Sequence, residues 1–140
     1  MRIAIGGLLL ATLALVACGS SGDGDEADDL TPAGVQACLE DAGFGVTVLP
    51  AQDVAEGAAH NRGPGQTGEL LVGANGAQPA PESDEADAVV AFWDSDEHAS
   101  TAPGVEEPTD VRIDVFGSIS VQPVSLRDPA ELESIESCAQ

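Results

Sequence analysis

The side chains best able to do chemistry in this 140-residue chain are two histidines, three cysteines and 25 acidic residues. His98 follows Asp94 by four positions, so a helix would bring both onto one face beside Glu97 as half of a metal site. A solvated helix start is the simpler interpretation. His60 either contacts an anion or lies on a surface loop. Trp93, the only tryptophan, ends an apolar run and either packs in the core or stacks on a ligand.

Motifs that would complete a catalytic site are missing from the sequence. It contains no GxSxG elbow, P-loop, HExxH or dinucleotide-binding glycine pattern. The acidic stretches 23–29 and 82–87 lack the glycine and terminal glutamate of an EF-hand. We therefore predict no catalytic residue, no metal and no cofactor, and expect a non-enzymatic binding or interaction module. An acidic calcium-binding module is the alternative, and a hydrolase ranks third.

The first eighteen residues have the pattern of an export signal. Arg2 precedes an apolar run from Ile3 to Val16, which is too short for a convincing membrane span. The run ends in Leu15-Val16-Ala17-Cys18, which resembles the lipobox of bacterial lipoproteins. The resemblance implies that residues 1–17 are removed and that Cys18 carries fatty acyl chains such as palmitate. The chain would then be anchored on the extracytoplasmic face of the cell membrane. An ordinary secretory signal, with Cys18 an incidental thiol, is the alternative.

The other two cysteines form an even pair once Cys18 is acylated, in a compartment where disulfides persist. Cys38 lies in a predicted helix that begins at Thr31-Pro32 and stops at Gly43. Its expected apolar face comprises Val35, Cys38, Leu39 and Ala42. A last helix begins at Asp128-Pro129-Ala130-Glu131, and its apolar face comprises Leu132, Ile135 and Cys138. We expect a Cys38–Cys138 disulfide, with two buried free thiols or a metal site as alternatives.

Charge narrows the classes of partner. Four arginines and no lysine oppose 25 acidic residues, which gives a net charge of −21. This field disfavours nucleic acid and anionic lipid surfaces, and favours cations, basic partners or high ionic strength. Solubility is the simplest explanation of the acidity. We therefore expect partners to be an envelope protein or a small ligand, besides the membrane reached through Cys18.

Organisation along the chain predicts a signal peptide (1–17), a flexible acidic Gly/Ser tether (18–29) and a single α+β domain (30–140). Strands are expected at 44–49, 69–72, 88–93 and 111–121, and a short helix capped by Asp94 or Ser95 through about Ala102. Residues 51–68 and 75–87 are expected to be mainly loop. These elements predict a small, mainly antiparallel sheet of four or five strands, with the terminal helices packed on one face. Ferredoxin-like wiring is one arrangement of this kind.

The segment 111–121 leaves a choice of turns. Its aliphatic residues all occupy odd positions, so a two-residue turn at Gly117-Ser118 would pair Val115 with Ser120. We predict instead a three-residue turn that pairs Val115 with Ile119. One long strand bent at Gly117 is the alternative.

Beyond the lipobox, the segment from Cys38 to Phe44, the apolar strand running into Asp-Ser-Asp-Glu and the terminal Cys138 are similar to many small exported bacterial proteins of uncharacterised function. That resemblance implies no activity and no functional residue other than Cys18.

Overall fold

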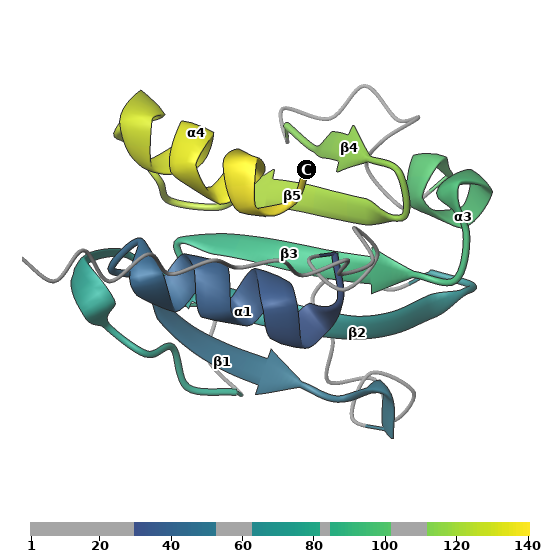
Figure 1. Cartoon of the computed structure of the whole chain (residues 1–140), viewed down its shortest axis with the longest axis horizontal. Helices are drawn as coiled ribbons and strands as arrows, with labels where there is room; N and C mark the ends of the chain where they lie inside the picture. Colours follow the sequence, from purple (N-terminus) through teal and green to yellow (C-terminus); the bar gives the residue numbers. More distant parts are fainter. Residues whose placement is uncertain (1–29, 53–62, 82–84, 102–111) are drawn as a thin grey trace, which may run out of the picture.

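The computed structural model describes residues 30–52, 63–81, 85–101 and 112–140. The described strands form one antiparallel sheet in the order β1-β2-β3-β5-β4. Their bounds are Gly45–Leu49 (β1), Gln66–Gly73 (β2), Ala88–Trp93 (β3), Asp114–Phe116 (β4) and Ile119–Pro123 (β5). Helices α1 and α4 cover one face of this sheet, and α3 lies at one end (Figure 1). The predicted α+β class, with terminal helices on one face, is confirmed.

The two terminal helices begin where their capping residues predict. The Thr31 hydroxyl accepts a hydrogen bond from the Gly34 amide at the start of α1 (Pro32–Asp41), and Gly43 follows its end with φ +92°. The Asp128 carboxylate accepts from the Ala130 amide at the start of α4 (Pro129–Cys138). In both helices a proline occupies the first turn, where no intrahelical amide donor is needed. Local sequence therefore sets where both helices begin.

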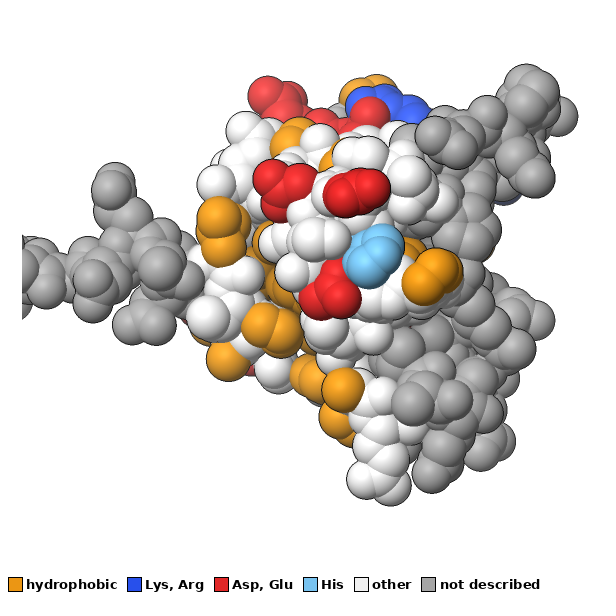
Figure 2. Space-filling view, turned by 90° about the vertical axis from the view of Figure 1, so that its right-hand side faces the viewer, with side chains coloured by type: hydrophobic (Ala, Val, Ile, Leu, Met, Phe, Trp, Pro, Cys, Tyr) orange, Lys and Arg blue, Asp and Glu red, His pale blue; other side chains and the backbone are white. Residues whose placement is uncertain are grey.

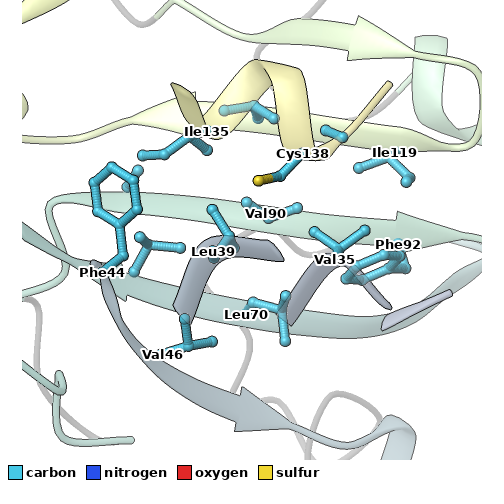
Figure 3. Packing of buried hydrophobic residues seen from close by; sticks show 14 residues of the cluster. Val35, Leu39, Phe44, Val46, Leu70, Val90, Phe92, Ile119, Ile135 and Cys138 are labelled. Carbon is cyan, nitrogen blue, oxygen red and sulfur yellow. The ribbon is translucent and has the colours of Figure 1, made fainter. Parts of the chain in front are cut away.

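The main hydrophobic core lies between these helices and the sheet (Figure 3). Val35 and Leu39 of α1 and Ile135 of α4 have no exposed surface. They pack on the sheet side chains Val46, Leu70, Val72, Ala88, Val90, Phe92, Ile119 and Val121. Alternate strand residues supply this face, as a half-buried sheet requires.

The opposite face of the sheet is buried too. The strand predicted at 88–93 is confirmed as β3, and all six of its residues are buried, as in a central strand covered on both sides. One cluster on the second face contains Leu49, Leu71 and Val89 together with Ala86, and another contains Ala91, Trp93 and Ala99. Ala99 belongs to α3 (Asp96–Ser100), so this short helix covers one end of the second face. Its cap is Ser95, one of the two predicted, and it ends before the predicted Ala102.

A backbone segment crosses β1 and β2 on the second face. Gly45 and Gly73 are paired across the two strands, and the Ala77 carbonyl lies where a Cβ on either glycine would stand. The Pro79 carbonyl accepts a hydrogen bond from the Thr47 hydroxyl at 2.5 Å. Two facing glycines thus form a slot for the chain that follows the short 3-10 helix η1 (Ala74–Gly76).

The β4–β5 hairpin corrects one prediction. Phe116 pairs with Ile119 and Val115 with Ser120, so the turn contains only Gly117 and Ser118. The predicted three-residue turn is therefore wrong. Gly117 has φ +58°, as the first position of a type II′ turn requires. This register, in which Val115 pairs with Ser120, is possible because apolar clusters lie on both faces of the sheet. Phe116 packs on the main core, and Val115 packs on the cluster around Trp93.

Two smaller differences concern β2 and the wiring. β2 begins at Gln66 rather than Glu69, and an irregularity in its pairing with β3 lies between Gln66 and Gly68. The first residues of β2, Gln66, Thr67 and Gly68, are polar or glycine, so they lack the apolar pattern that predicts a strand. The order of elements, α1-β1-β2-β3-α3-β4-β5-α4, differs from the βαββαβ order of the ferredoxin-like arrangement.

Candidate functional site

Several predicted functional residues lie outside the described residues. These are Cys18 with the tether, His60, and part of the acidic stretch 82–87. Among the helices that the structure does describe, none has the length and hydropathy needed to cross a membrane.

The predicted disulfide joins α1 to α4. Cys38 and Cys138 are bonded, with a Cα–Cα distance of 5.7 Å and a sequence separation of 100. Cys138 is 8% exposed and belongs to the main core, as predicted. Cys38 does not lie on the buried stripe of α1: it is exposed, and that stripe consists of Val35 and Leu39. Cys38 instead points sideways to α4, which is the direction that a bond between two neighbouring helices needs.

An open groove runs over this disulfide between α1 and α4. Its volume is about 530 Å³, and its lining comprises Cys38, Ala42, Ala130, Glu133, Ser134, Ser137 and Cys138. A second hollow of about 260 Å³ shares Ala42, Ala130 and Ser134 and continues to Phe44 and Asn75. Small alanine and serine side chains line both hollows. The result, called here the α1–α4 groove, is a concave surface with an acidic wall and a disulfide floor.

His98 and Asp94 meet as their four-residue spacing predicts. His98 Nδ1 lies 2.5 Å from Asp94 Oδ1, and the two side chains are 40% and 50% exposed. This hydrogen bond lowers the pKa of Asp94. The pair lies over Gly65, whose carbonyl accepts from the Asp94 amide at 2.8 Å and whose missing side chain leaves room for the imidazole. Figure 2 shows this end of the molecule, where the histidine lies among acidic side chains.

The described neighbour of this pair, Ser95, is already engaged in hydrogen bonds. The nearby Ser95 hydroxyl caps α3 by accepting from the His98 amide, and donates to Asp94. Within the part of the chain that the structure describes, no cluster of three or more His, Cys, Asp or Glu side chains is placed to hold a metal ion. Trp93 is a core residue, 4% exposed, with its indole N–H donating to the Ser120 hydroxyl at 2.9 Å. Trp93 therefore packs in the core, the first of its two predicted roles.

Asp87 has a structural role that its place in an acidic stretch concealed. Its carboxylate accepts from the Ala74 amide at 2.8 Å and from the Ser125 hydroxyl at 2.5 Å. These two hydrogen bonds, the one from Ser125 first, lower the pKa of Asp87. Its carbonyl also accepts from the amides of residues 124–126. One aspartate thus ties η1 to the connection between β5 and α4.

The pKa of Glu136, on α4, is raised, whereas that of Asp87 is lowered. Arg112 lies between two carboxylates, with Nε 2.6 Å from Asp114 Oδ2 and Nη2 3.1 Å from Glu136 Oε1. Burial, followed by the neighbouring Asp114 carboxyl, raises the pKa of Glu136, and Arg112 only partly offsets this. The cluster links α4 to the strand edge at β4.

We predict that Asp87→Asn and Glu136→Gln change the pH dependence of stability in opposite ways. A lowered pKa in the folded state stabilises the domain above about pH 4, and this contribution is lost as pH falls through the folded pKa. Asp87→Asn should therefore flatten the loss of stability in acid. Glu136 has a raised pKa in the folded state, so it stabilises the folded domain at pH values below its pKa in the unfolded chain. This contribution is lost as pH rises through the pKa of the folded state. Glu136→Gln should therefore improve stability at pH 7 relative to pH 3. Urea unfolding at both pH values measures each effect, and equal signs would contradict the assignment.

The α1–α4 groove could not be found from the sequence. Its lining residues are small or acidic and come from the two ends of the chain, so no local pattern marks them. The one usable signal was the expected Cys38–Cys138 bond, which places the two helices side by side.

Comparisons with known proteins give this chain no relatives: no family model, no curated protein and no solved structure matches it.

Proposed function

We propose that this chain is a lipid-anchored extracytoplasmic protein whose α+β domain is a non-enzymatic binding module. The observation that carries the proposal is the division of the three cysteines. Cys18 ends a lipobox-like sequence, whereas Cys38 and Cys138 are bonded to one another. A disulfide is typical of oxidising compartments outside the cytoplasm, which supports export. Two or more acyl chains on Cys18 would hold the protein at the membrane without a spanning helix.

Replacing Cys18 by alanine tests the anchor. The variant should lose incorporation of labelled palmitate and move from the membrane fraction to the soluble exported fraction, because it lacks the thiol that would carry the acyl chains. Cys38→Ala should keep its label, which controls for the loss of a cysteine in general. Label uptake by Cys18→Ala, or its retention on membranes, would count against the anchor.

The α1–α4 groove is the contact surface we propose for the partner. Its acidic wall and the net charge of −21 complement a positively charged protein surface. Among the described residues, the hydroxyl beside the Asp94–His98 pair is that of Ser95, and its use as a helix cap favours binding over catalysis.

Photo-crosslinking on intact cells tests the binding surface. A photoreactive residue at Ser134, in the groove, should capture a discrete partner, and 0.5 M salt should weaken the capture by screening charge. The same residue at Glu97, exposed on α3, is the matched control and should not capture that partner. Identical products from both positions, or capture that salt leaves unchanged, would contradict the assignment of the groove.

A further inference from the structure

The two sulfur-bearing residues on the floor of the α1–α4 groove differ sharply in access. Cys38 is exposed on the side of α1, whereas Cys138 is 8% exposed. Figure 3 shows Cys138 among core side chains, beside Ile135. Both line the same open groove of about 530 Å³. Of the two cysteines in this groove, Cys38 is therefore the more accessible.

We propose that the disulfide is a regioselective thiol-exchange site whose reagent is a neutral or positively charged dithiol. A thiolate of the reagent attacks Sγ of Cys38, forming a mixed disulfide there, while the Cys38–Cys138 bond breaks and its electron pair leaves with Cys138. The Cys138 thiolate takes a proton from water. The second thiol of the reagent then attacks its own bound sulfur and releases Cys38 as a thiolate. Two electrons pass from the dithiol to the protein, and the reagent becomes a cyclic disulfide.

Access decides which sulfur is attacked. An attacking sulfur must reach its target from the side opposite the bond that breaks, and exchange rates depend on that access. The low exposure of Cys138 restricts this approach in the folded domain. Burial also makes Cys138 the poorer leaving group, since an apolar environment disfavours its thiolate. This effect slows the attack on Cys38 but does not change the site of attack. Cys38 is the better leaving group, but it can leave only after an attack on Cys138, whose sulfur is less accessible.

Charge around the groove selects the reagent. Glu133 lines the hollow over the disulfide, and Glu131 lines the adjoining one. The linings described for the two hollows contain no basic side chain. Anionic thiols therefore approach against a negative potential, while a cationic group on the reagent lowers that cost. This preference should weaken as salt screens the field.

Trapping the mixed disulfide tests the site of attack. The full chain carrying Cys18→Ser is exposed briefly to cysteamine, quenched in acid, unfolded, labelled with maleimide and mapped by mass spectrometry. We expect the cysteamine adduct on Cys38 and maleimide on Cys138, with a preference of roughly tenfold or more, because access differs between the two sulfurs. The same reaction in urea should give nearly equal adducts. Equal adducts in the folded protein, a preference for Cys138, or no exchange before global unfolding would overturn the proposal.

Comparing two thiols of opposite charge tests the selectivity. Per thiolate, cysteamine should react roughly tenfold faster than mercaptoethanesulfonate at low ionic strength, and the ratio should fall towards that of the urea-unfolded chain in 1 M salt. Charge-neutralising Glu133→Gln should reduce the ratio, whereas Glu97→Gln on α3 should leave it unchanged. A rate ratio that changes neither with salt nor in the Glu133→Gln variant would overturn the choice of reagent. The mapping of the adduct to Cys38 or Cys138 is a separate test of the site of attack.

Discussion

Replacing Cys38 and Cys138 together by alanine is expected to lower the free energy of unfolding by about 4–5 kcal/mol. The bond closes a loop with a sequence separation of 100, so its loss returns a large conformational freedom to the unfolded chain. A small domain commonly has only about 5–15 kcal/mol of stability. We therefore expect a variant close to the limit of folding. Urea unfolding, followed by fluorescence of the buried Trp93, measures the loss.

Two controls separate the bond from its surroundings. Wild-type protein reduced by excess dithiol should lose nearly the same free energy, because reduction removes the cross-link and keeps both side chains. Ser134→Ala, in the same groove, should change stability by less than about 0.5 kcal/mol, as exposed substitutions usually do. A reduced protein as stable as the oxidised one would show that the cross-link is not what holds the domain.

Gly73→Ala is expected to cost about 3 kcal/mol, at the upper end for overpacking. The added methyl group would occupy the place of the Ala77 carbonyl, and a backbone atom cannot rotate away as a side chain can. The segment after η1 must therefore lift from the sheet, which strains the Thr47–Pro79 hydrogen bond. Chemical denaturation measures the cost, and hydrogen exchange should show faster exchange of the Ala77 amide.

Gly68→Ala is the matched control on the same strand. Its Cβ would come no closer than 3.8 Å to the nearest atom, the Leu49 carbonyl, so we expect a change below about 1 kcal/mol. Gly45→Ala should resemble Gly73→Ala because both glycines face the same Ala77 carbonyl. The double variant should then cost less than the sum of the two, since one displacement relieves both clashes. Equal costs for Gly68→Ala and Gly73→Ala would contradict the slot.

The elements predicted best from the sequence are those determined locally. Thr31 and Asp128 cap their helices through residues two or three positions away, and the run 88–93 is apolar enough to require a buried strand. The α+β class and the disulfide follow once these elements pack together. The predictions that failed depended on how distant surfaces meet.

Cys38 and the β4–β5 turn show the two kinds of failure. Cys38 lies only about 60° around the helix from Val35, so apolar periodicity could not separate a side facing the sheet from one facing α4. The turn was mispredicted because one face of the hairpin was assumed to be solvated. With both faces buried, Phe116 and Val115 each meet an apolar cluster, and the two-residue register costs nothing in burial.

The candidate site was predicted only in its parts. The Asp94–His98 contact follows from helical spacing, but the use of Ser95 as a cap needed the backbone. The role of Asp87 could not be found at all, because its partners Ala74 and Ser125 are far from it in sequence. Long-range hydrogen bonds of this kind leave no periodic trace.

The joining of the first and last helices also determines how the domain carries mechanical load. A pull applied between Leu30 and Gln140 enters α1, crosses from Cys38 to Cys138 and leaves through the end of α4. The chain between the cysteines, with a separation of 100 residues, lies outside this path and represents about 340 Å of extended length. The chain outside the bond, from Leu30 to Cys38 and from Cys138 to Gln140, extends to at most roughly 35 Å, so the oxidised domain can lengthen only by less than this. Its sheet stays shielded from tension, whereas the reduced domain offers the whole sheet to the force.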